Sequence, residues 1–429
     1  LCRQMGVSPW YFWADVPIHK KAFFELSTSY EKVDWPDVQY RGIFINDEEE
    51  LDAWAKAHTV DGTIGPCTYE KIYELLLRLK GNYIWPAMHV NCFNENTENA
   101  KLADRMGIIV GTSHCDMLLR SNQNEWKPWL QKKGYNDTLY DYSIEGENRE
   151  RIHEYWTESV ENNKDYEVCY TVGMRGIHDS GFVTKNIDEN AELNAQQKKK
   201  KKIELLGQVI SDQRQILMDV LGEKRGRQAL QTFIPYKEVL DLYDSGLDLP
   251  EDITLIWVDD NFGYMRRYPN QKERTRSGGN GLYYHASYWA HPGMSYLFFN
   301  SIPLAQTGNE LKKCWESGIR KMWVLNVGAL KPLEMDIEYF LRYGWEADRE
   351  TSLTKDTRYF VSEWINDNFS GEYGNSVSSI YHSFAQLNNI CKPEHLMSEK
   401  YSQIAYGNEA KKRLDCLGTC KIEAEKIYE

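Results

Sequence analysis

The stretch TLIWVDDN, residues 254–261, decides how the rest of the chain is interpreted. A short apolar run ends directly in two aspartates and an asparagine, which is typical of a buried parallel strand with polar residues at its carboxyl end. Seven more short apolar runs recur along the chain, and nearly all end in Asp, Glu, His, Asn or Arg. They are RGIFIND (41–47), NYIWPAMH (82–89), GIIVGTSH (107–114), YEVCYTVGMRG (166–176), TFIPYKE (232–238), LYYHASYW (282–289) and KMWVLNVG (321–328).

Helical patterns separate most of these runs, and Thr97 is expected to cap the second helix. Eight strand–helix units predict an α/β fold, a (β/α)8 TIM barrel over residues 41–345, with its chemistry at the carboxyl ends of the strands. The helical patterns cover residues 68–81, 97–107, 148–163, 190–222, 310–321 and 332–345.

The two ends of the chain follow other patterns. Residues 1–40 contain three prolines and many aromatic residues, and we expect an opening segment that follows a missing N-terminal domain. Residues 346–429 show helical periodicity without intervening strands, which predicts a helical region that is truncated at its end.

Composition excludes several classes of partner. The net charge of −13 argues against a nucleic acid and against an anionic membrane surface, because both need a basic footprint. No apolar run approaches the length of a membrane span, about 18 residues, and no signal peptide is visible. The five lysines at 198–202 suggest either a targeting patch or a solvated helix face, and the acidic remainder of the chain favours the helix face. The nine scattered cysteines are interpreted mainly as buried thiols.

Acidic residues follow five of the eight predicted strands. Any one of them, Asp47 and Asp260 in particular, could instead cap a helix. Cations, amides, histidines and aromatic rings accompany them, which suits a polyhydroxylated substrate. A sugar that itself carries a carboxylate would account for the cations. The acids are Asp47, Glu48, Asp116, Asp179, Glu238, Asp259 and Asp260, and their companions include Arg175, Lys237, His114, His285, Asn261 and Tyr288.

Two of these acids form a candidate catalytic pair. Glu238 and Asp179 follow adjacent strands, and hydrolysis of a glycosidic bond needs one protonated and one ionised carboxyl group. Their sequence neighbours, Lys237 for Glu238 and Arg175 for Asp179, are expected to move the two pKa values apart. The sequence leaves open which of the two is the acid, and whether the reaction inverts or retains configuration.

A metal-dependent hydrolase is the competing interpretation. His89, His178, His285 and the His114–Cys115–Asp116 run could assemble a metal site on a barrel. No strand offers a His-x-His pair, and a cation at Arg175 disfavours a metal. We therefore expect no metal and no other cofactor.

Long motifs then show a family likeness. They are GVSPWYFWADVP, YRGIFINDEE, NYIWPAM, GIIVGTSH, GMRGIHD, DQRQIL, the stretch from YKEVLDLYDSG to GYMRRYPN, RSGGNGLYYHASYW, LNVG followed by KPLE, and KPEHLMSEKYS. In these motifs the chain resembles glycoside hydrolase family 115, the α-glucuronidases that remove glucuronic acid or its 4-O-methyl ether from xylan.

The resemblance implies an inverting, metal-free hydrolase of terminal α-linked glucuronic acid, with Glu238 as general acid and Asp179 as general base. It implies a glucuronic-acid-bearing polysaccharide as partner, a secreted or periplasmic location, and a homodimer formed through domains outside this sequence. The implied sugar-site residues are Arg175, Asn261, His285 and Tyr288, with Asp259, Glu48, His114 and Asp116 as further contacts, and Lys237, beside the acid, is also expected to bind substrate.

Two positions depart from the family pattern. The chain reads GTSHCDML where the family often has GTSHHEPM, and Ala329 stands where an aspartate is usual. These changes bear on substrate contacts, so the substrate is left open between xylan and arabinogalactan side chains. A catalytically impaired carbohydrate-binding barrel remains the alternative function.

Overall fold

The computed structural model describes residues 5–12, 22–23, 25–46, 48–286, 300–369 and 373–390, with isolated positions at 411, 415, 418, 421 and 422. Three predictions fall outside these residues. They concern Asp47, Tyr288 and most of the helical region after residue 390. The side chain of His178 is likewise not described.

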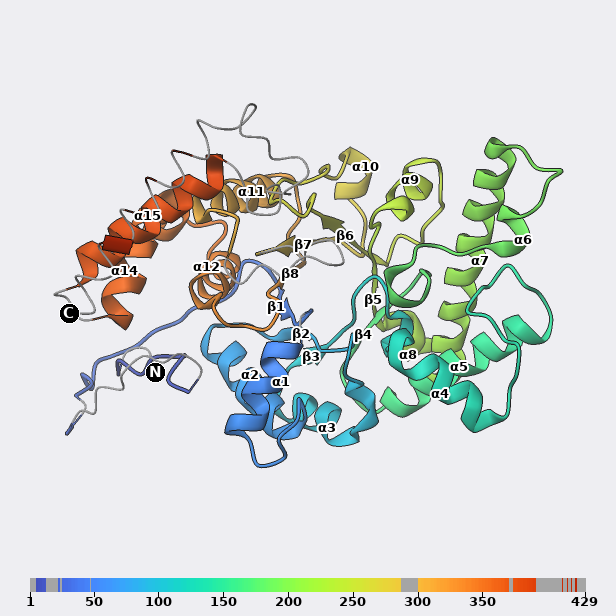
Figure 1. Cartoon of the computed structure of the whole chain (residues 1–429), viewed down its shortest axis with the longest axis horizontal. Helices are drawn as coiled ribbons and strands as arrows, with labels where there is room; N and C mark the ends of the chain where they lie inside the picture. Colours follow the sequence, from blue (N-terminus) through green and yellow to red (C-terminus); the bar gives the residue numbers. More distant parts are fainter. Residues whose placement is uncertain are drawn as a thin grey trace.

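Eight parallel strands form one sheet in the order β3-β2-β1-β8-β7-β6-β5-β4. A parallel bridge between Val110 and Val168 joins its two ends, so the sheet closes into a barrel (Figure 1). Each predicted run overlaps one strand, and the predicted (β/α)8 fold is confirmed. The strands are β1 (Tyr40–Phe44), β2 (Tyr83–Trp85), β3 (Ile109–Val110), β4 (Cys169–Thr171), β5 (Leu230–Phe233), β6 (Thr254–Val258), β7 (Asn280–His285) and β8 (Met322–Asn326).

Helices surround the strands, and α14 and α15 lie beside α11 and α12, at the end of the molecule opposite α6 and α7 (Figure 1). Short 3-10 helices η1 (Phe93–Glu95), η2 (Met117–Leu119) and η3 (Ile177–Asp179) interrupt the loops. The helices are α1 (Glu49–His58), α2 (Pro66–Arg78), α3 (Thr97–Met106), α4 (Asn122–Lys133), α5 (Glu147–Asn163), α6 (Lys185–Asp188), α7 (Ala195–Leu221), α8 (Glu223–Gln228), α9 (Glu238–Asp244), α10 (Gln271–Arg274), α11 (Leu304–Glu316), α12 (Glu334–Trp345), α13 (Ser352–Lys355), α14 (Thr357–Asn368) and α15 (Gly374–Ile390).

One helix cap differs from the prediction. Thr97 is the first residue of α3, and Asn96 is the cap, because the Asn96 side chain accepts a hydrogen bond from the backbone N–H of Glu98 at 3.0 Å. The division into an opening segment, a barrel over 41–345 and a truncated helical region stays a prediction.

The barrel has two apolar cores. One lies between the strands and the surrounding helices. The other is formed by strand and strand-end residues, and it includes Tyr83, Trp85 and Tyr283. Gly111 leaves room for this second core, because a Cβ there would lie 2.0 Å from the Tyr83 hydroxyl. The large rings pack against one another, so the aromatic content of the chain serves the core as well as the site.

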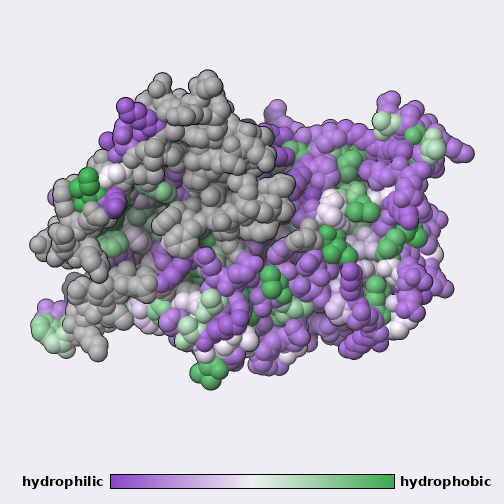
Figure 2. All heavy atoms as spheres, viewed as in Figure 1, coloured by the Kyte–Doolittle hydropathy of each residue, from purple (hydrophilic) through white to green (hydrophobic). Residues whose placement is uncertain are grey.

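The lysine run lies on a solvated face of α7, as the acidic composition favours. Lys199 pairs with Asp241 and Lys202 with Asp188, each at 2.7 Å. Figure 2 shows mainly hydrophilic residues over the end of the molecule that carries α6 and α7. Among the described helices, none has the length and hydropathy needed to cross a membrane.

Candidate active site

The loop after β4 carries two of the predicted site residues, and α7 fixes its path. Gly173 has a φ of +114°, a conformation that favours glycine. The buried side chain of Gln213 on α7 accepts from the Gly173 N–H and donates to its carbonyl, both at 2.8 Å. These two bonds hold the backbone two residues before Arg175.

Arg175 is the centre of the site. Its Nε and Nη2 donate to the two carboxylate oxygens of Glu238, at 3.0 and 2.9 Å. Its Nη1 contacts Oδ1 of Asp179. A single buried guanidinium therefore holds both predicted catalytic carboxylates, with the forked geometry that makes Arg–carboxylate pairs strong.

Glu238 is the first residue of α9, and its side chain is 40% exposed. Besides the Arg175 pair, it accepts a hydrogen bond from the backbone N–H of Phe182 at 2.9 Å. Partial burial raises the pKa of Glu238, but the hydrogen bonds and charge of Arg175 and the Phe182 N–H outweigh burial and hold the pKa below its usual value. Glu238 is therefore ionised in the unliganded protein at neutral pH.

Asp179 ends η3 and is 34% exposed. Its Oδ2 pairs with Lys237 Nζ at 2.7 Å, and its Oδ1 lies 3.2 Å from His114 Nε2. The predicted pairing of neighbours is thus wrong in part. Lys237 contacts Asp179 and not its own neighbour Glu238, while Arg175 serves both acids.

Neutral groups complete this side of the site. Burial, followed by the charges of Arg175 and Lys237, holds the pKa of His114 well below its usual value, so its imidazole is neutral. Burial, followed by the nearby Asp116, raises the pKa of Cys115 to about 12. The Cys115 thiol is therefore protonated, and it lies 3.5 Å from Oδ1 of Asp179.

A second pair lies at the ends of β6 and β7. The fully buried Asp259 lies 2.6 Å from His285 Nδ1 and accepts the His285 backbone N–H at 3.1 Å. Asn261 accepts a hydrogen bond from the Tyr236 hydroxyl at 3.2 Å. The Tyr236 ring lies 4.1 Å from the His114 ring, so these residues connect the two halves of the site.

Three site residues have left-handed backbones without being glycine. The φ values of Asp179, Lys237 and Asn261 are +59°, +49° and +71°. Such conformations cost free energy and often occur where function fixes a side chain. Each of the three lies in a loop or turn after a strand, so the barrel presents its polar side chains through strained turns.

Glu48 and Asp116, which were predicted to contact substrate, have structural partners. Glu48 is buried and accepts backbone hydrogen bonds from residues 89, 90 and 91. Asp116 is buried, and accepts from the Ser113 hydroxyl at 3.4 Å and the Asn122 N–H at 3.2 Å. Neither acid contacts the Glu238–Asp179 pair among the described residues, so their role as sugar contacts stays a prediction.

The residues fit a metal poorly. Ligand atoms of His114, Cys115 and Asp179 lie within 4.8 Å of one another. Arg175 and Lys237 already neutralise the same aspartate, and their positive charges disfavour a metal cation beside it.

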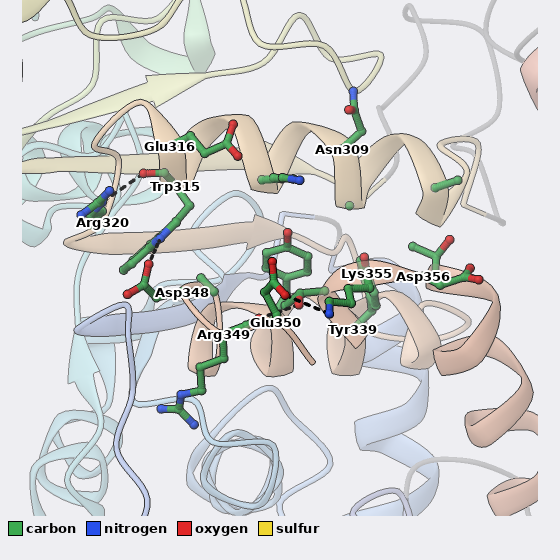
Figure 3. Close-up of a pocket in the computed structure, with 17 residues that line it drawn as sticks. Asn309, Trp315, Glu316, Arg320, Tyr339, Asp348, Arg349, Glu350, Lys355 and Asp356 are labelled. Atoms are coloured by element: carbon green, nitrogen blue, oxygen red, sulfur yellow. Dashed lines mark hydrogen bonds and ion pairs between the residues drawn. The ribbon is translucent and has the colours of Figure 1, made fainter. Parts of the chain in front are cut away.

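A separate cavity of about 650 Å³ lies between α11, α12 and residues 347–357 (Figure 3). Polar contacts join side chains of its lining. Lys355 contacts Glu350 at 2.9 Å, and the Trp315 indole N–H donates to Asp348 at 2.9 Å. None of the predicted catalytic residues lines this cavity.

Two site residues were missed from the sequence. Tyr236 directly precedes Lys237 and Glu238, and an aromatic residue next to a predicted catalytic acid could have indicated a place in the site. Gln213 lies in the middle of a long helix, and no local pattern links it to Gly173, which is 40 residues away.

A parallel eight-stranded barrel with paired carboxylates after its strands is typical of glycoside hydrolases. Residues 33–395 match the model of Glycosyl hydrolase family 115, and the chain belongs to this family.

A solved structure described as "a novel family GH115 4-O-Methyl-alpha-glucuronidase, BtGH115A, with specificity for decorated arabinogalactans" is 36% identical to this chain. It has a TM-score of 0.85, and the match covers 99% of this chain but 55% of that one, so the chain spans about half of its length.

A second structure, described as a "GH138 enzyme targeting pectin rhamnogalacturonan II", shares the fold alone. It has 12% identity and a TM-score of 0.50, over 85% of this chain and 45% of that one. No curated protein matched.

Proposed function

We propose that the chain is the catalytic barrel of an α-glucuronidase that releases terminal α-linked glucuronic acid, or its 4-O-methyl ether, from a polysaccharide. The observation that carries this proposal is the guanidinium of Arg175, which holds Glu238 and Asp179 together at an open site. The proposed pair requires that both side chains project into one pocket and leave room between them for a water, and their common contact with Arg175 supports the first requirement.

In the proposed mechanism the reaction inverts the anomeric configuration. Protonated Glu238 gives its proton to the glycosidic oxygen as the bond to the sugar breaks. Ionised Asp179 takes a proton from the water that attacks the opposite face of the ring. Lys237 keeps Asp179 ionised, because an opposite charge at 2.7 Å favours the carboxylate. Asn261 and His285 are proposed to bind sugar hydroxyls, and Tyr288 stays a predicted contact.

The proposed substrate is a polysaccharide that carries glucuronic acid, because the cations of the site match a uronate carboxylate. The solved family member is described as specific for decorated arabinogalactans, while the sequence resemblance favoured xylan. Incubation with each polysaccharide distinguishes these two candidate substrates.

The chain is incubated with glucuronoxylan, decorated arabinogalactan and undecorated controls, and the freed acid and its anomer are followed by proton NMR. We expect β-glucuronic acid to appear first from at least one decorated polymer. Glu238→Gln should lower the rate at least about 100-fold, the usual contribution of a general acid.

Glu363→Gln is the matched control. Glu363 on α14 pairs with Arg342 at 2.9 Å and is 35% exposed, which resembles the Arg175–Glu238 pair. Normal turnover by Glu238→Gln would reject the assignment. Binding of these polymers by the wild-type chain without release of acid would favour the impaired carbohydrate-binding barrel.

A further inference from the structure

The site presents a problem of protonation. Hydrolysis with inversion needs one protonated carboxyl group, yet both Glu238 and Asp179 are paired with cations. An acid held by an arginine remains ionised at neutral pH. The proton that the leaving oxygen needs must therefore reach the site after the unliganded arrangement has changed.

The two acids differ in how many cations hold them. Asp179 contacts Arg175 and, independently, Lys237. Among the described residues, Arg175 is the single cation in contact with Glu238, which otherwise accepts the Phe182 N–H. Loss of Arg175 would therefore leave Glu238 without a counter-ion but would leave Asp179 with one.

The binding position formed by Nε and Nη2 of Arg175 fits a carboxylate. Glu238 occupies it with two parallel hydrogen bonds, and a uronate carboxylate offers the same two oxygens in the same plane. The Arg175 side chain is 3% exposed while that of Glu238 is 40% exposed, so solvent reaches this pair through Glu238. An incoming carboxylate therefore reaches Arg175 by displacing Glu238.

We propose that the carboxylate of the substrate's uronic acid replaces Glu238 on Arg175, and that the released Glu238 takes a proton from solvent and becomes the general acid. This inference rests on the proposed function. The bound proton passes to the glycosidic oxygen, water supplies hydroxide to the anomeric carbon and a proton to Asp179, and Asp179 returns that proton to solvent. Departure of glucuronate lets Glu238 pair with Arg175 again.

The charged and titratable groups around Glu238 support this order of events. They are Arg175 and Asp179 from the loop after β4, Lys237 at the start of α9, and His114 from the loop after β3. His114 is neutral, and Lys237 is occupied by Asp179. When Arg175 pairs with the uronate, Glu238 loses its counter-ion and a second anion lies nearby. Both changes raise the pKa of Glu238, because each disfavours its charged form.

The exchange predicts a particular kind of specificity. An α-glucoside has no carboxylate, so it leaves Glu238 paired with Arg175 and unprotonated. Such a substrate should lose kcat as well as affinity, because only the uronate creates the acid form.

Proton uptake on ligand binding tests the exchange. The 429-residue chain is titrated with D-glucuronate by calorimetry, at about pH 6, in buffers of different ionisation enthalpy. We expect uptake of about one proton per bound glucuronate, since Glu238, whose pKa Arg175 holds below its usual value in the unliganded protein, becomes protonated once it is released. D-Glucose should cause no uptake. The wild-type affinity for glucuronate should rise as pH falls, by up to about tenfold per unit.

Two variants complete the test. Glu238→Gln should abolish uptake, and Glu363→Gln, the arginine-paired control on α14, should retain it. Binding of glucuronate without uptake, uptake that survives in Glu238→Gln, or failure of the wild type to bind glucuronate would each overturn the exchange. Release of glucuronic acid from a polysaccharide without uptake would overturn this inference alone. Uptake without release from any polysaccharide would overturn the proposed function and support the exchange at the binding step.

Discussion

At the scale of single residues, the site depends on which cation reaches which acid. Lys237 adjoins Glu238 in sequence but pairs with Asp179 across the site, and its backbone has a positive φ. Asp179 therefore has two counter-ions and Glu238 has one. In the proposed mechanism the base is the acid that keeps a counter-ion, and this asymmetry supports the order of roles implied by the family resemblance.

Removal of the base should be rescued by an external nucleophile. Asp179→Ala is expected to lower kcat on a glucuronic-acid-bearing oligosaccharide by about 100-fold or more, since no group then activates water. Azide should restore part of the rate and give β-glucuronosyl azide, because it enters from the face that the base serves. The product is identified by NMR.

Glu238→Ala is the comparison, because loss of the acid cannot be repaired from the opposite face. A lack of rescue in Asp179→Ala, or an azide product of α configuration, would show that Asp179 is not the base of an inverting reaction.

At the scale of elements, α7 supports the catalytic loop. This helix runs from Ala195 to Leu221 on the outside of the barrel, and Gln213 at its buried face binds both backbone groups of Gly173. The β4 loop thereby gains a fixed path to Arg175. The helix would be interpreted from sequence as a covering helix only, yet it positions the guanidinium that holds both acids.

Gln213→Ala should therefore reduce activity as well as stability. The change leaves a buried N–H and a buried carbonyl unsatisfied, which costs about 2–4 kcal/mol in unfolding free energy. We expect kcat to fall more than KM rises, because Arg175 loses its fixed position. Urea unfolding and steady-state kinetics measure the two effects.

The matched control is Gln215→Ala on the same helix. Gln215 is exposed and bonds Asp219 at 2.7 Å, so its loss should change neither property. Equal kinetic effects from the two variants would show that α7 does not position the loop.

At the scale of the whole molecule, two buried acids make stability depend on pH. Burial raises the pKa of Asp116, after β3, and of Asp336, on α12, to about 8. An aspartate in the unfolded chain has a pKa of about 3.9. Between these values the folded protein holds protons that the unfolded chain lacks, so the contribution of each group to stability falls as pH rises.

Asp116→Asn should remove one of these contributions. The unfolding free energy of the variant minus that of the wild type should increase as pH rises from about 5 to about 8, by at most about 1.4 kcal/mol per pH unit. Urea unfolding at several pH values measures the difference. Asp252→Asn breaks an exposed pair with Arg214 at 2.8 Å, and its plot of unfolding free energy against pH should run parallel to that of the wild type. A parallel curve for Asp116→Asn would contradict the expectation.

The sequence by itself determined the barrel, because a buried parallel strand needs a continuous apolar run, and eight such runs followed by polar residues leave few other folds. It also placed Glu238 and Asp179 on adjacent strands, since strand order follows chain order around a barrel. The Asn96 cap was missed because Asn96 and Thr97 are both good capping residues and only the backbone geometry separates them.

Only the tertiary structure decided the partners of each polar side chain. The contacts between Arg175 and Glu238, Lys237 and Asp179, and Gln213 and Gly173 join residues that are 40 to 63 positions apart. Contacts of this kind depend on side-chain direction at turns with positive φ, which apolar periodicity does not encode. For that reason the sequence did not show that Glu48 and Asp116, which the family resemblance places among the sugar contacts, also accept backbone hydrogen bonds from residues 89 and 122.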